Sequence, residues 1–139
     1  MDAMRTETWL AHRVSYGETD AMGVVYHAEY LHYFERSRNA LCRACGMSYR
    51  EIEQSGFALP VREVQCRYRR PARYDDVIQI HVWIAEWRRA SIRFQYEILD
   101  ESRSDVLCEG MTFHAFTSLE GRPVAIPGWI RERLDVKPA

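Results

Sequence analysis

The hydrophobic pattern changes its period near Pro60, and this change restricts most strongly how the chain can fold. From about His27 to Cys45, apolar residues recur at helical spacing over a wide arc. From Pro60 onward they occupy every second position, which is typical of strands with one apolar face. Because a further strand is expected at about Trp9–Gly17, the predicted order is one strand, one long helix and four antiparallel strands.

The other expected elements follow from local patterns. The first strand should carry Tyr16 on its apolar face, and the strand after Pro60 should bury Val64 while its other face is wet. Ser48 and Glu51 have the spacing of a capping box and predict the start of a short helix. The remaining expected elements are strands at about Val77–Trp87, Ala90–Leu99 and Val106–Thr117, and short helices at about Ser48–Ser55 and Pro127–Leu134.

Length and composition indicate a single α+β domain spanning residues 1–139. A single sheet must bury its apolar face, and the long helix is the only element large enough to cover it, so we expect the sheet to wrap around this helix. The net charge of −1 argues against nucleic acid or an anionic membrane as partner. No apolar run is long enough to span a membrane, and Met1–Glu7 lacks the apolar segment of a signal peptide, so a cytoplasmic protein is expected.

The cysteines and histidines do not predict a metal site. Cys42 and Cys45 form a C-x-x-C pair late in the helical pattern, without a second such pair or clustered histidines to complete a zinc site. Reduced cysteines in the core are therefore the expected state. The other histidines show no metal-ligand spacing with carboxylates; these are His12, His32, His81 and His114.

The stretch Tyr16–Tyr30 carries the most informative chemistry. Asp20 lies about six residues before the helical pattern, whereas a capping residue bonds to an N–H two or three residues further on. A carboxylate held near a helix N-terminus lies beside backbone N–H donors, an arrangement that suits attack on a carbonyl whose oxyanion needs stabilisation. Gly23 would allow a substrate to approach the main chain closely. The structural alternative for Asp20 is an Asx turn, and Glu18 is expected to be a solvated loop acid.

Tyr16–Tyr30, with its acid-Thr-Asp, Met-Gly-Val-Val-Tyr-His and following Tyr, resembles the signature of hot-dog-fold acyl-CoA thioesterases. The similarity is to the 4-hydroxybenzoyl-CoA thioesterases and to the thioesterase associated with the Tol–Pal system. A second match lies at Tyr74–Val77 and Glu86–Ser91, and the strand order also fits, so the resemblance covers almost the whole chain. It implies a hot-dog fold, in which a five-stranded antiparallel sheet wraps around a central helix.

The resemblance also implies roles for individual residues. Asp20 would be the catalytic carboxylate, either as a nucleophile that forms a mixed anhydride or as a base that activates water. The backbone N–H of His27 would hold the oxyanion, and Tyr26 would lie beside the acyl group. Arg88 and Arg89 would bind the phosphates of CoA, because the planar guanidinium makes bidentate contacts with phosphate. Further candidates for substrate contacts are Ser91 and Arg122.

Several alternatives remain open at this stage. Glu35 is a competing carboxylate, because a second branch of hot-dog thioesterases places the acid on the central helix; its structural interpretation is a salt bridge to Arg36, Arg38 or a neighbouring turn. The His27 ring itself could act as acid or base. The expected reaction is hydrolysis of an acyl-CoA, with an aromatic group such as 4-hydroxybenzoyl favoured over long fatty chains. The alternatives are an acyl carrier protein thioesterase and a non-catalytic acyl-CoA-binding protein. No cofactor or metal is expected beyond the CoA of the substrate, and the family predicts a homodimer or homotetramer.

Overall fold

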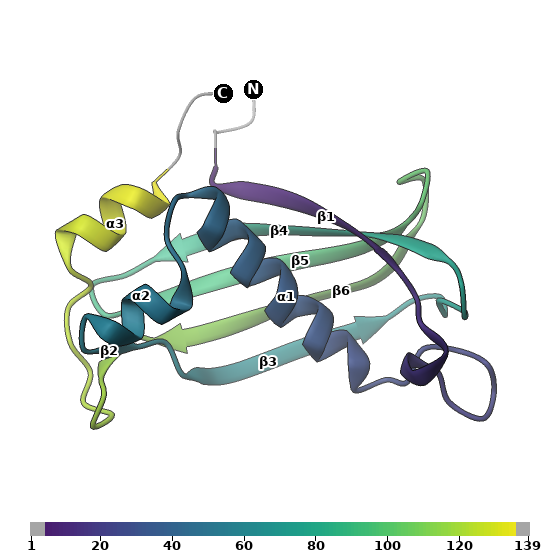
Figure 1. Ribbon diagram of the computed structural model, residues 1–139, viewed down its shortest axis with the longest axis horizontal. Helices are drawn as coiled ribbons and strands as arrows, with labels where there is room; N and C mark the ends of the chain where they lie inside the picture. The colour runs from purple at the N-terminus through teal and green to yellow at the C-terminus, as the bar shows by residue number, and fades with distance from the viewer. Residues whose placement is uncertain (1–4, 136–139) are drawn as a thin grey trace.

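The computed structural model describes residues 5–135; part of the N-terminal segment on which the signal-peptide argument rests lies outside this range. Figure 1 shows one antiparallel sheet with a long helix lying across one face. The main elements are β1 (Glu7–Arg13), α1 (Glu29–Ala44), β3 (Val61–Tyr68), β4 (Val77–Trp87), β5 (Ser91–Asp100) and β6 (Val106–Ala115). The smaller ones are η1 (Tyr16–Glu18), α2 (Tyr49–Gln54), β2 (Phe57–Ala58), β7 (Thr117–Ser118) and α3 (Gly128–Leu134).

The strands of the main sheet are arranged in the order β1-β4-β5-β6-β3, and every neighbouring pair is antiparallel. The first strand and the last four strands of the chain thus form one sheet, as the sequence predicts. The long helix α1 packs against the inner face of this sheet. The predicted α+β architecture, a five-stranded sheet around one helix, is confirmed.

Alternation along β4 and β5 builds the core. Every second residue from Ile78 to Ile84 and from Ile92 to Ile98 is buried, which is the behaviour expected of strands with one covered face. On the helix side, the Phe34 ring stacks on the ring of Tyr96, with centroids 4.2 Å apart. The buried inward residues of the two strands are Ile78, Ile80, Val82, Ile84, Ile92, Phe94, Tyr96 and Ile98.

Three local expectations are wrong. The first strand ends at Arg13 instead of Gly17, and Tyr16 is 78% exposed because the η1 turn rotates it out of the core. The helix begins at Glu29, two residues later than expected. Val64 is exposed, and β3 as a whole is exposed on both faces except at Cys66. The reason is that β3 is an edge strand, which pairs with β6 on one side and with no other strand of residues 5–135.

Ser48 caps α2 as predicted, since its side chain accepts a hydrogen bond from the Glu51 N–H at 3.2 Å. Among residues 5–135, none of the helices is both long enough and apolar enough to cross a membrane.

Candidate active site

The segment between η1 and α1 folds into a closed loop that holds the main candidates together. The Tyr26 N–H donates to the Glu18 carbonyl at 2.9 Å, and the Asp20 N–H donates to the Val24 carbonyl at 2.8 Å. Gly23 has a φ of 79°, a conformation that a side chain would disfavour, and this allows the chain to reverse. Asp20, Tyr26 and the His27 amide therefore belong to one small, hydrogen-bonded unit.

The Asp20 carboxylate is partly exposed and is held on one side. Its Oδ1 accepts the Met22 N–H at 2.8 Å, which is the hydrogen bond of an Asx turn. The other oxygen, Oδ2, makes no hydrogen bond within residues 5–135. Because α1 begins at Glu29, this carboxylate does not cap the helix. One oxygen is thus fixed, and the other can meet a water molecule or a carbonyl carbon.

His27 lies just before the first turn of α1. Its N–H donates to no acceptor in the described part of the chain, so this amide can bind an oxyanion. Its carbonyl accepts the Tyr68 hydroxyl at 2.6 Å, and its ring lies 4.5 Å from the Tyr26 ring. Tyr26 is 48% exposed, and its role beside the acyl group stays a prediction.

A hollow of about 230 Å³ opens beside His27, between the start of α1 and β3. The rings of Tyr30 and Tyr68 meet edge to face inside this region, 5.1 Å apart. Tyr68 was not predicted as a site residue, because a tyrosine in an alternating strand is indistinguishable from a core residue. The hollow is lined by Val24, Val25, His27, Tyr30, Tyr68, Arg69, Arg70 and Pro71, so Asp20 lies outside this lining.

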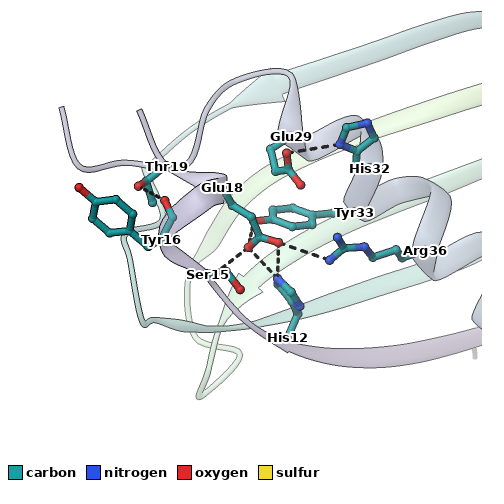
Figure 2. Close-up of polar contacts among 9 residues, drawn as sticks. All are labelled: His12, Ser15, Tyr16, Glu18, Thr19, Glu29, His32, Tyr33 and Arg36. Atoms are coloured by element: carbon teal, nitrogen blue, oxygen red, sulfur yellow. Dashed lines mark hydrogen bonds and ion pairs between the residues drawn. The ribbon is translucent and has the colours of Figure 1, made fainter. Parts of the chain in front are cut away.

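Glu18 corrects the sequence prediction of a solvated acid, since it is only 9% exposed. In Figure 2, four groups converge on its carboxylate from β1, η1 and α1. Oε1 accepts the Ser15 N–H at 2.9 Å and the Tyr33 hydroxyl at 3.1 Å. His12 Nε2 lies 2.9 Å from Oε1, and Arg36 donates to Oε2 at 3.5 Å.

These contacts decide the charge of Glu18. Burial by itself opposes ionisation, but the hydrogen bonds from His12, the Ser15 N–H and Tyr33 outweigh it, so the pKa of Glu18 is lowered. Burial and the Glu18 charge raise the pKa of Tyr33, which therefore remains a neutral donor. Glu18 is thus an ionised carboxylate fixed beneath the loop.

The competing acid Glu35 is exposed on α1, and within residues 5–135 it forms neither the predicted salt bridge nor another ion pair. Arg36 contacts Glu18 instead, while Arg38 donates to the hydroxyls of Tyr49 and Tyr96. Within the part of the chain that the structure describes, no three His, Cys, Asp or Glu side chains are grouped so as to hold a metal ion.

The predicted CoA-binding residues lie at the opposite end of the sheet. β1 ends at Arg13, where the loop begins, and Arg13 pairs with Val77 at the start of β4. Arg88 follows the last residue of β4. Eleven residues of β4 separate the two ends by about 33 Å. In Figure 1, the Asp20 loop lies on the right and the turn between β4 and β5 on the left.

At that distant end, Arg88 is already engaged. Its Nε donates to Glu86 at 2.5 Å, and Arg93 contacts the other oxygen of the same carboxylate. Arg89 is exposed and has no ion pair within residues 5–135. Ser91 and Arg122 belong to the same end, at the start of β5 and after β7. A single chain thus brings together Asp20, Tyr26 and His27, but separates them from the four candidates for CoA binding.

Comparison with known proteins places the chain in a family. The model of the thioesterase-like superfamily matches residues 14–134, so this protein belongs to that superfamily. The predicted relationship to hot-dog thioesterases is thereby confirmed.

Particular relatives agree with this assignment. The acyl-CoA thioester hydrolase YbgC of Escherichia coli is 32% identical over 115 residues, which cover 83% of this chain and 86% of YbgC. The crystal structure of DHNA-CoA thioesterase from Staphylococcus aureus has a TM-score of 0.84 at 26% identity and covers 91% of this chain and 87% of that one. A 1,4-dihydroxy-2-naphthoyl-CoA thioesterase from Synechocystis, at 22% identity, shares the fold with a TM-score of 0.86 and coverage of 92% and 95%.

Proposed function

We propose that this protein hydrolyses acyl-CoA thioesters to a free acid and CoA. Membership of the thioesterase-like superfamily and the names of relatives such as YbgC support this class of reaction. The observation that carries the proposal is the closed loop of residues 18–26, which presents the Asp20 carboxylate next to a helix start where the His27 N–H is unbonded.

The chemistry requires a carboxylate and an oxyanion donor. In one route, Asp20 attacks the thioester carbon, the C–S bond breaks, CoA leaves as its thiolate, and water hydrolyses the resulting anhydride. In the other, Asp20 removes a proton from the water that attacks the same carbon. In both routes the His27 N–H stabilises the negative charge that develops on the carbonyl oxygen.

The hollow beside His27 favours a compact acyl group. Its volume is about 230 Å³, and its walls include the rings of Tyr30 and Tyr68. An apolar cavity of about 150 Å³ accommodates benzene, so the hollow has room for an aromatic or short aliphatic acyl group. We therefore propose an aromatic or short-chain acyl-CoA as substrate.

A dimer would complete the site. β3 has an unpaired edge and exposes Val61, Val64 and Tyr68, which is a surface expected to be covered. Antiparallel pairing of β3 with its copy reverses the direction of the second chain, so the Arg89 end of one subunit would approach the Asp20 end of the other. We propose a homodimer with sites between its subunits, and the pairing of dimers into a tetramer stays a prediction.

The test is release of free thiol from 4-hydroxybenzoyl-, benzoyl-, short-chain and long-chain acyl-CoA by the wild type, Asp20→Asn and Glu35→Gln. Loss of the acid or base should lower kcat by at least about 100-fold in Asp20→Asn, whereas Glu35→Gln should retain activity. An active Asp20→Asn would refute the proposed role of Asp20, and an inactive Glu35→Gln beside it would move the catalytic acid to α1. If the folded wild type cleaves only thioesters of acyl carrier protein, the substrate's carrier would be acyl carrier protein instead of CoA.

Mixing two impaired chains tests the shared site. A dimer of Asp20→Asn and Arg89→Ala chains would contain one intact site if Arg89 acts on the partner's substrate. Subunit exchange should then raise activity above that of either variant alone. Activity that stays at the average of the two variants would mean that Asp20 and Arg89 of the same chain serve the same site, which would contradict the proposed arrangement.

A further inference from the structure

The Glu18 carboxylate joins three parts of the protein at one point. It contacts His12 on β1, the Ser15 N–H at the start of η1, and both Tyr33 and Arg36 on α1. A buried carboxylate is costly unless its oxygens receive donors, and here each oxygen receives at least two. The contacts therefore fix the position of η1 against the sheet and the helix.

The main chain of the same residue holds the proposed oxyanion donor. The Glu18 carbonyl accepts the Tyr26 N–H at 2.9 Å, and Tyr26 immediately precedes the His27 amide. Asp20 follows Glu18 by two residues. Thr19, the residue between these two acids, forms an isolated β-bridge with Val25. Displacement of Glu18 would thus move both the carboxylate and the His27 N–H.

We propose that Glu18 is a positioning residue, whose ionised side chain anchors the loop that carries Asp20 and the His27 N–H against β1 and α1. This inference rests on the proposed function of that loop. The negative charge matters because Arg36 and His12 donate hydrogen bonds to the carboxylate. A neutral amide at this position has a single acceptor oxygen, and its NH2 group would face donors. Glu18 does not need to touch the substrate, since its effect passes through the geometry of the loop.

Glu18→Gln tests the proposal with little change in volume. The matched control is Glu7→Gln. Glu7 is the first residue of β1, and like Glu18 it contacts a histidine, in this case His81 at 2.8 Å. Glu7 is at the opposite end of β1 from the loop. Both variants lose a carboxylate–histidine contact, so an effect that comes from that contact alone should appear in both.

Two measurements are made on each variant. Steady-state kinetics should show kcat reduced about 10- to 100-fold in Glu18→Gln with KM changed by less than about threefold, since misplacement by an ångström has effects of this size. Hydrogen exchange should show the amides of residues 19–27 exchanging at least about tenfold faster, while β4 and β5 keep the protection of the wild type. Glu7→Gln should show neither effect.

Three outcomes would overturn the proposal. Glu18→Gln with normal kcat and normal loop exchange would show that the contacts do not position the loop. Faster exchange throughout the sheet with a matching loss in Glu7→Gln would assign Glu18 to general stability. If the wild type cleaves no thioester, the proposed function fails, but the exchange measurement still decides whether Glu18 holds the loop.

Discussion

Acidification from pH 7 to pH 5 should destabilise this protein through one buried histidine, His114. Its side chain is fully buried, with Nδ1 3.0 Å from the Leu59 carbonyl and Nε2 2.8 Å from the Thr112 hydroxyl. Thr112 in turn contacts the Tyr96 hydroxyl at 2.6 Å, and Tyr96 accepts a hydrogen bond from Arg38 at 3.1 Å.

The two ends of this chain fix its outer hydrogen bonds. Arg38 can only donate and the Leu59 carbonyl can only accept, so His114 carries a proton on Nδ1. In the neutral imidazole, Nε2 accepts from the Thr112 hydroxyl and Thr112 accepts from Tyr96, so that every hydroxyl hydrogen of the chain has an acceptor. A second proton on Nε2 would face the Thr112 hydroxyl and leave the hydrogen of that hydroxyl without its acceptor.

The free-energy change follows from the pKa. Burial, together with the positive charge of Arg38, lowers the pKa of His114 from 6.5 to about 4, although the bond to the Leu59 carbonyl opposes this. Between these values the unfolded chain binds a proton that the folded protein does not, so stability falls as the pH falls from about 6.5 to about 4. The free energy of unfolding should decrease by about 2 kcal/mol between pH 7 and pH 5 from this residue alone.

Urea denaturation of the wild type and His114→Gln at the two pH values measures this term. Glutamine offers a donor and an acceptor but does not titrate. On acidification, the free energy of unfolding of His114→Gln should therefore decrease by about 2 kcal/mol less than that of the wild type. His32→Gln is the control, since His32 is exposed on α1 and its replacement removes an imidazole that lies outside the buried hydrogen-bond chain. Equal losses in the wild type and His114→Gln would refute the reasoning.

Two further predictions concern the core. Gly110→Ala should lower the free energy of unfolding, measured in urea, by about 1–3 kcal/mol. The reason is that the new Cβ would lie 2.5 Å from a β3 carbonyl oxygen and 2.7 Å from the Phe34 ring. Gly17→Ala is the control and should change the stability little, because its Cβ would meet nothing within 4 Å. Arg38→Met should raise the pKa of His114, measured by NMR titration of its ring, because it removes a positive charge; an unchanged or lower pKa would contradict this.

The sequence predicts the architecture because alternation and helical spacing report directly which side of an element is covered. The four inward residues from Ile78 to Ile84 illustrate this, because they occupy every second position of β4 and all four are buried. Val64 shows the limit of the same rule. It alternates equally well, but β3 is the edge strand and α1 does not cover it, and position within a sheet is not a local property of the sequence.

The candidate site is predicted to a similar extent. The stretch that carries Asp20 and His27 is recognisable because loop, glycine and helix follow one another in the chain. The sequence does not reveal that this stretch is separated from Arg88 and Arg89, because the separation depends on the direction in which β4 runs through the sheet. Sequence resemblance supplies the residues of such a site without showing whether one chain can bring them together.

Glu18 and Asp20 show most clearly what tertiary structure adds. Both are acids of one loop, and each accepts a backbone N–H from a nearby residue, yet one is buried and the other is partly exposed. The difference comes from Tyr33 and Arg36, which lie 15 and 18 residues further along and reach Glu18 only when α1 packs on the sheet. The donors around Glu18 occupy both of its oxygens, whereas only one oxygen of Asp20 accepts a hydrogen bond within residues 5–135. A pattern of neighbouring residues contains both carboxylates, but the packing of α1 determines which of them is buried.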